Sequence, residues 1–170
     1  MAVVKKFSKL VNSIHTNRID DSNIIEMWKV INPKLKIDEL DYAQENYLDN
    51  ARNLGKMFRA WKATCNVPIS AMLIDTLTIS FLRNYGYRDK SFSHYDYLTR
   101  DFLNFLANQD PQRNSWIVPG STKNALREGK FEDKAKLSFF DASRATDLEN
   151  TNEFQANVYW KKIFGKYFVE

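Results

Sequence analysis

The sequence has few of the residues that build metal sites, disulfides and tight turns. Its 170 residues include two histidines, one cysteine, five glycines and four prolines. The lone Cys65 excludes an internal disulfide, and His15, His94 and Cys65 do not have zinc-ligand spacing. Because hairpins and bulges consume glycine, its scarcity favours long helices over strands.

Long apolar runs and blocks of like charge are also missing. No run approaches the length that crosses a bilayer, and lysines interrupt the first 15 residues too often for a signal peptide. A net charge of +4 permits a nucleotide or nucleic-acid partner without requiring one. With 44% hydrophobic and 14% aromatic residues, the chain has the composition of a globular protein. We expect a cytoplasmic protein without membrane contact.

Apolar residues recur at helical spacing along most of the chain, which predicts an all-α bundle of about five to six helices. Ser93 is the expected N-cap of the helix that begins near residue 95. Asn150 is the expected N-cap of the last helix. We expect a loop over 16–23, an extended segment over 24–33 and irregular structure over 108–129. The expected helices are 3–15, 38–65, 70–86, 95–107, 131–148 and 150–165.

The corner between the second and third expected helices is the best-defined local feature. Pro68 lacks an amide hydrogen and stops the first of these helices, and Ser70 is a good N-cap for the next. We expect Trp61, Leu73 and Leu77 to be buried between the two helices.

Four basic residues occupy one face of the helix before this corner. Arg52, Lys56, Arg59 and Lys62 follow one another at spacings of four, three and three. Two interpretations stay open: a solvated face with extended side chains, which is the commoner case, or a cationic ridge directed at phosphates. The candidate carboxylate pairs fall in a polar loop or in first turns of helices, where solvation and capping explain them, so no catalytic or metal-binding residue is expected. They are Asp20–Asp21, Asp38/Glu39/Asp41 and Glu132–Asp133.

The corner lies within residues 58–82, FRAWKATCNVPISAMLIDTLTISFL. In this stretch a basic residue, Arg59, stands two before Trp61, and a turn containing Pro68 follows. Ser70 then precedes an apolar helix that bears an acid, Asp75. This pattern resembles the helical C-terminal domain of bacterial cyclic-oligonucleotide synthases, the CD-NTases with a SMODS domain, which are related to oligoadenylate synthases and cGAS. The likeness continues through DKSFSHYDYLTRDFLNFLANQD, WIVPGS and FEDKAKLSF, reaches back over WKVINPKLKIDELD, and covers roughly residues 25–168.

The resemblance implies an N-terminal helix and linker over 1–23 and a helical nucleotidyltransferase-type domain over 24–170. The catalytic palm of that family carries Asp-x-Asp and a third Asp, which hold two magnesium ions. This sequence contains no Asp-x-Asp, and no acid closely follows Gly120–Ser121. We therefore interpret the chain as having lost the palm near residues 21–25. Alone it is expected to be inactive and to need no cofactor, whereas the intact family uses Mg²⁺ with ATP or GTP.

By position, the resemblance makes Arg59, Lys62 and Ser70 the candidate nucleotide-binding residues. The expected family serine falls on Ala71, one place from Ser70, so N-capping is the better role for Ser70. The implied function is that of a truncated synthase from an antiphage signalling system. Nucleotides and a palm-containing chain are then its possible partners.

Two alternative functions belong to other classes. The first is an interaction or regulatory protein that binds a partner synthase through the surface a palm would cover. The second is a nucleic-acid-binding helical module, which ranks last because the net charge is modest.

Overall fold

The computed structural model of the protein describes residues 2–15 and 42–169. Within these residues the chain forms six α-helices and one two-stranded sheet, which confirms the all-α class. The expected loop over 16–23, the extended segment over 24–33 and the start of the expected 38–65 helix lie outside the described residues. The α-helices are α1 (Ala2–His15), α3 (Tyr42–Cys65), α4 (Ala71–Asn84), α5 (Tyr95–Ala107), α6 (Glu132–Leu148) and α7 (Glu153–Phe164).

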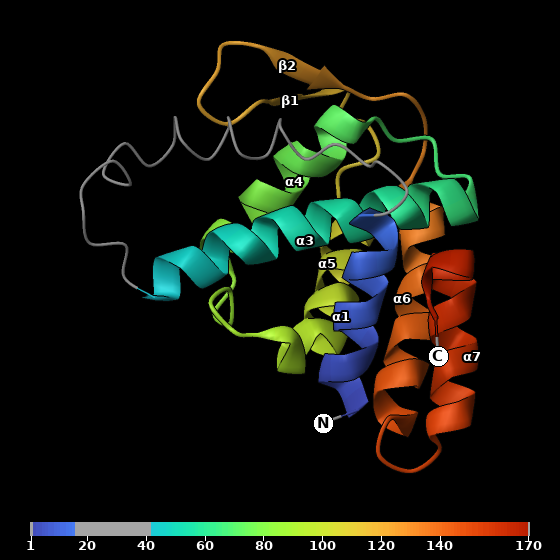
Figure 1. Ribbon diagram of the computed structural model, residues 1–170. Helices are drawn as coiled ribbons and strands as arrows, with labels where there is room; N and C mark the ends of the chain where they lie inside the picture. The colour runs from blue at the N-terminus through green and yellow to red at the C-terminus, as the bar shows by residue number, and fades with distance from the viewer. Residues whose placement is uncertain (1, 16–41, 170) are drawn as a thin grey trace.

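The bundle is built around α6, which packs against α5 on one side and α7 on the other. α3 crosses α1, and α4 lies beyond α3 near the hairpin at the top of Figure 1. Short 3₁₀ helices lead into α5 (Phe92–His94) and follow α7 (Gly165–Tyr167). As predicted, the face of α3 that carries Leu54, Phe58 and Trp61 is fully buried.

α1 belongs to the same hydrophobic core as the helices after residue 42. The ring of Phe7 packs edge-on against Trp160, with ring centroids 5.2 Å apart, and against Tyr95 at 6.1 Å. Beside it, the buried Lys6 ammonium lies 2.5 Å from Oε1 of Glu149. Removing two charges from water is costly, and this cost is recovered only when the ions are well paired. The pair therefore favours the observed packing of α1 against the C-terminal end of α6.

A β-hairpin forms in the segment expected to be irregular, and the sequence analysis missed it. β1 (Ser115–Ile117) pairs antiparallel with β2 (Asn124–Leu126), and Trp116 faces Ala125 across the buried side. The amide of Ser121 donates to the carbonyl of Val118 at 3.0 Å, which closes the predicted Pro119–Gly120 turn. Gly120 has φ +72°, the conformation that the third position of a type II turn requires.

Three local predictions near α5 and α7 were wrong. Ser93 caps no helix, because a 3₁₀ turn precedes α5 and the Ser93 hydroxyl bonds Nδ1 of His94 instead. The N-cap of α7 is Asn152, whose side chain accepts from the amide of Gln155 at 3.1 Å, two residues after the expected Asn150. Phe154 has helical spacing to Val158, which predicts a place on the apolar face of α7, but its side chain is 72% exposed.

Candidate functional site

The corner at residues 62–70 includes the end of α3 at Cys65 and the next residue, Asn66, which has a left-handed backbone conformation. Asn66 has φ +50°, and the amide of Val67 donates to the carbonyl of Lys62 at 3.0 Å. This is the Schellman arrangement, in which a residue that tolerates positive φ closes the last turn. Pro68 follows two residues later, so Asn66 ends the helix and Pro68 prevents it from resuming.

Ser70 starts α4, as predicted. Its hydroxyl accepts from the amide of Leu73 at 3.0 Å, and its carbonyl accepts from the amide of Ile74 at 3.0 Å. The Ser70 hydroxyl therefore satisfies a first-turn amide that has no acceptor within the helix, and the Ser70 carbonyl accepts the first intrahelical hydrogen bond of α4. Leu73 and Leu77 are buried, as expected for the α4 side of the corner.

Arg59 does not extend into solvent. Its Nη2 lies 2.7 Å from Oδ1 and 2.5 Å from Oδ2 of Asp75 on α4. The side chains are 9% and 0% exposed, so this is a buried ion pair that connects α3 to α4. These two residues are the base and the acid of the pattern that carries the family resemblance, and both sit inside the corner.

The predicted ridge of four basic residues is not continuous. Lys56 is buried together with Arg59, whereas the side chains at the two ends, Arg52 and Lys62, are more than a third exposed. Lys62 faces Glu128 at 3.9 Å, an exposed pair that contributes little stability. Of the three candidate residues, Arg59 is paired inside the corner, Ser70 is partly buried and caps a helix, and Lys62 is partly exposed.

One buried donor of this corner has no acceptor among the described residues. Within residues 2–15 and 42–169, Nη1 of Arg59 has no hydrogen-bond partner, although the atom is buried. A buried donor without a partner costs free energy, and its presence in a structure calls for an explanation.

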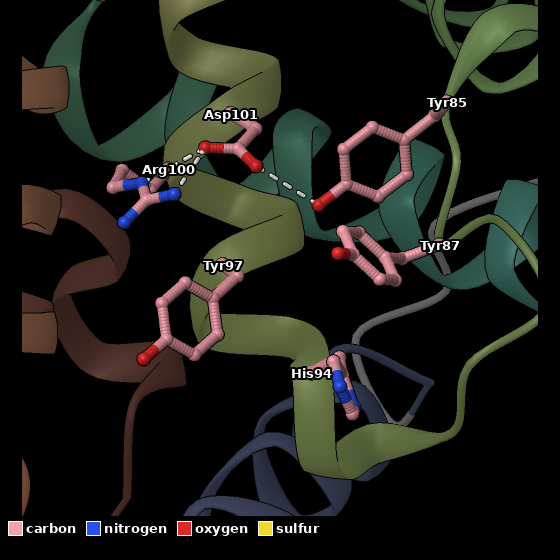
Figure 2. Close-up of a pocket in the computed structure, with 6 residues that line it drawn as sticks. All are labelled: Tyr85, Tyr87, His94, Tyr97, Arg100 and Asp101. Carbon is pink, nitrogen blue, oxygen red and sulfur yellow. Dashed lines mark hydrogen bonds and ion pairs between the residues drawn. The ribbon is translucent and has the colours of Figure 1, made fainter.

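A second candidate site is a pocket of about 250 Å³ at the far end of α4. Figure 2 shows its lining side chains around a shared hollow. They come from the turn after α4, from the 3₁₀ helix and from the first two turns of α5. The lining residues are Tyr85, Tyr87, His94, Tyr97, Arg100 and Asp101.

The polar groups of this pocket are joined through Asp101. Its carboxylate accepts from the Tyr85 hydroxyl at 2.9 Å and from Nε of Arg100 at 2.8 Å. The Arg100 guanidinium also lies over the ring of Tyr97, 4.9 Å from its centroid. Burial raises the pKa of Tyr85, and the charge of Asp101 raises it further, so its phenol remains a donor through the physiological range.

The sequence contained a signal for this pocket that the motif search did not use. Residues 85–97, YGYRDKSFSHYDY, hold four of the eight tyrosines. Periodicity does not identify this cluster, because three of its lining residues lie outside an α-helix and only the fold brings them to α5.

No group of three or more His, Cys, Asp or Glu side chains in residues 2–15 and 42–169 has the geometry to hold a metal ion. In that part of the chain, no helix is both long and apolar enough to span a bilayer.

Comparison with known proteins adds no relative. A scan against protein-family models, a search of curated proteins and a search of solved structures each found no match.

Proposed function

We propose that this chain is the helical half of a cyclic-oligonucleotide synthase-like nucleotidyltransferase, without the metal-binding palm and without catalytic activity of its own. The observation that carries the proposal is the order of its sequence landmarks: the 58–82 corner, then residues 89–110, then WIVPGS, then FEDKAKLSF. The missing Asp-x-Asp supports inactivity, because triphosphate chemistry of this kind needs carboxylates to hold magnesium. The proposal includes a cytoplasmic location and a role in antiphage signalling.

The nucleotide-facing role is proposed for Lys62, at the corner. Its side chain is 37% exposed near the C-terminus of α3, and its ammonium would attract a phosphate oxygen. Arg59 supports this corner from inside, because its guanidinium is buried against Asp75. Ser70 already caps α4, so its contribution to such a site is to hold the corner in place.

The test is isothermal titration of the protein with ATP and GTP, each with Mg²⁺. Binding that weakens in Lys62→Ala, but not in the matched control Lys136→Ala on the exposed face of α6, would support the nucleotide-facing role. No heat change at millimolar nucleotide would reject that role. A radiolabelled product assay on the protein alone should remain blank, and any oligonucleotide product would contradict the proposed inactivity.

One structural observation favours the second candidate, an interaction protein. Large apolar side chains are more than half exposed at Leu137 and Phe140 on α6 and at Ile117 and Leu126 on the hairpin. Single exposed hydrophobics are normal, but pairs on one element indicate an association surface. Sedimentation at high concentration tests this: a strictly monomeric species would count against self-association. The nucleic-acid alternative loses support, because the centre of its basic ridge is buried.

A further inference from the structure

The pocket at the C-terminal end of α4 has the size and lining of a small-molecule site. An engineered cavity of roughly 150 Å³ holds benzene, so about 250 Å³ has room for one larger ring system. We propose that this pocket binds a flat heteroaromatic ring carrying an anionic group, the chemistry of a purine mononucleotide. The site is new relative to the corner, since the 14 residues of α4 separate the two by about 20 Å.

The first argument is the exposure of aromatic faces. Tyr87 is 58% exposed and Tyr97 is 44% exposed, and both line the hollow. The rings of Tyr87 and His94 are stacked with an interplanar angle of 25° and centroids 6.1 Å apart. The exposed rings of Tyr87 and Tyr97 offer flat surfaces to a planar ligand, and every nucleobase has a π-face that stacks on such rings.

The second argument is the hydrogen-bonding edge of the pocket. The Asp101 carboxylate, the Tyr phenols and the Arg100 guanidinium lie along its rim. Arg100 uses Nε and Nη2 on Asp101, an exposed pair whose side chains are about 30% accessible. Arginine presents five donors in a planar fork, so this residue can hold Asp101 and still donate to a phosphate.

The third argument is the placement of charge in the pocket. The lining holds one cation, Arg100, and one anion, Asp101, whose carboxylate already accepts hydrogen bonds from Tyr85 and Arg100. Three tyrosines around a hollow also suit an alkylammonium ion, but the guanidinium beside Tyr97 would repel it, so the lining favours an anion.

The probe is AMP, titrated calorimetrically into the whole protein at low salt, with adenosine and ribose 5-phosphate as the two halves of the ligand. AMP is expected to bind more tightly than either half. Tyr97→Ala should weaken AMP binding about 5- to 150-fold, the range of one lost stacking partner. Tyr97→Phe should retain it, because the ring remains, and Arg100→Gln should reduce the affinity for AMP to that for adenosine.

The matched control is Tyr159→Ala on α7, where Lys162 lies 4.5 Å over the ring in the same way that Arg100 lies over Tyr97. Unchanged AMP binding in this control, with a normal circular dichroism spectrum for every variant, completes the supporting result. The proposal is overturned if AMP gives no binding heat at about 10 mM, ten times a roughly millimolar Kd. It is overturned as well if tetramethylammonium displaces AMP. It is also overturned if Tyr97→Ala has no effect. Lys62→Ala separates the two sites, since it affects only a nucleotide bound at the corner.

Discussion

Breaking the Arg59–Asp75 pair is the sharpest test of what holds the corner together. Arg59→Met removes the cation with little change of volume and leaves the Asp75 carboxylate, which is 0% exposed, facing an apolar group. Truncating one partner of a buried ion pair costs about 3–5 kcal/mol, because the Asp75 charge then stays buried after losing its contact with the Arg59 guanidinium. For a chain of this size, each kcal/mol lowers Tm by about 2–4 °C, so we expect a fall of roughly 6–20 °C.

The assay is urea unfolding followed by tryptophan fluorescence, since Trp61 is fully buried on α3, two residues along the chain from Arg59. The free energy of unfolding should drop with an unchanged m value, as expected when stability changes and the surface exposed on unfolding does not. The double variant Arg59→Met with Asp75→Leu should recover most of the loss, because replacing both ions by apolar groups is close to neutral.

The reasoning is refuted if Arg59→Met costs less than about 1 kcal/mol, the value of an exposed pair. Arg59 would then contribute little to the corner and would be available to a ligand. An additive double variant, with no recovery, would equally show that the two charges do not interact across α3 and α4.

Three further changes test single features. Gly165→Ala should destabilise the protein by about 1–3 kcal/mol in thermal unfolding, because Gly165 has φ +56° and an added Cβ would lie 2.9 Å from Thr64. The control is Gly86→Ala, where an added Cβ would meet no atom within 4 Å, and it should be neutral or slightly stabilising. Ser70→Ala should cost about 0.5–2 kcal/mol in the same assay, and Ser70→Asp, which still caps a helix, should cost clearly less; equal losses would contradict capping. Burial raises the pKa of Asp96, so the stability gained from its protonated form is present below about pH 4 and is lost as pH rises through the raised value. Asp96→Asn should therefore gain stability relative to the wild type between pH 4 and pH 7 in urea titrations, and a constant difference would contradict the burial argument.

The features that the sequence predicted well are those in which local chemistry and packing agree. The stripe through Leu54, Phe58 and Trp61 is apolar at helical spacing and is buried, and Ser70 caps the helix it precedes. In these places one face of one element carries the whole signal. The cap at Asn152 was assigned two residues early because Asn150 is as good a cap chemically, and only the geometry of the α6–α7 turn separates them.

The features that the sequence missed depend on contacts between distant residues. The 115–117 and 124–126 strands are three residues each, too short to show alternation, and Trp116 is buried only because the hairpin folds onto the bundle. Helical spacing placed Lys56 and Arg59 on one face with Lys62, but it could not tell which part of that face α4 covers. Asp75, 16 residues away, decides the position of Arg59.

The position of this ion pair changes what the family resemblance supports. Its pattern includes a base two before Trp and an acid on the following helix, and here Arg59 and Asp75 bond each other inside the corner. Because these two residues hold two helices together, the pattern is an argument about the geometry of the corner, and it says less about ligands. The functional argument therefore rests on exposed groups: Lys62 at the corner, and Tyr87, Tyr97 and Arg100 at the pocket. Measuring AMP and ATP binding in Lys62→Ala and Tyr97→Ala side by side tells which of these two surfaces, if either, binds a nucleotide.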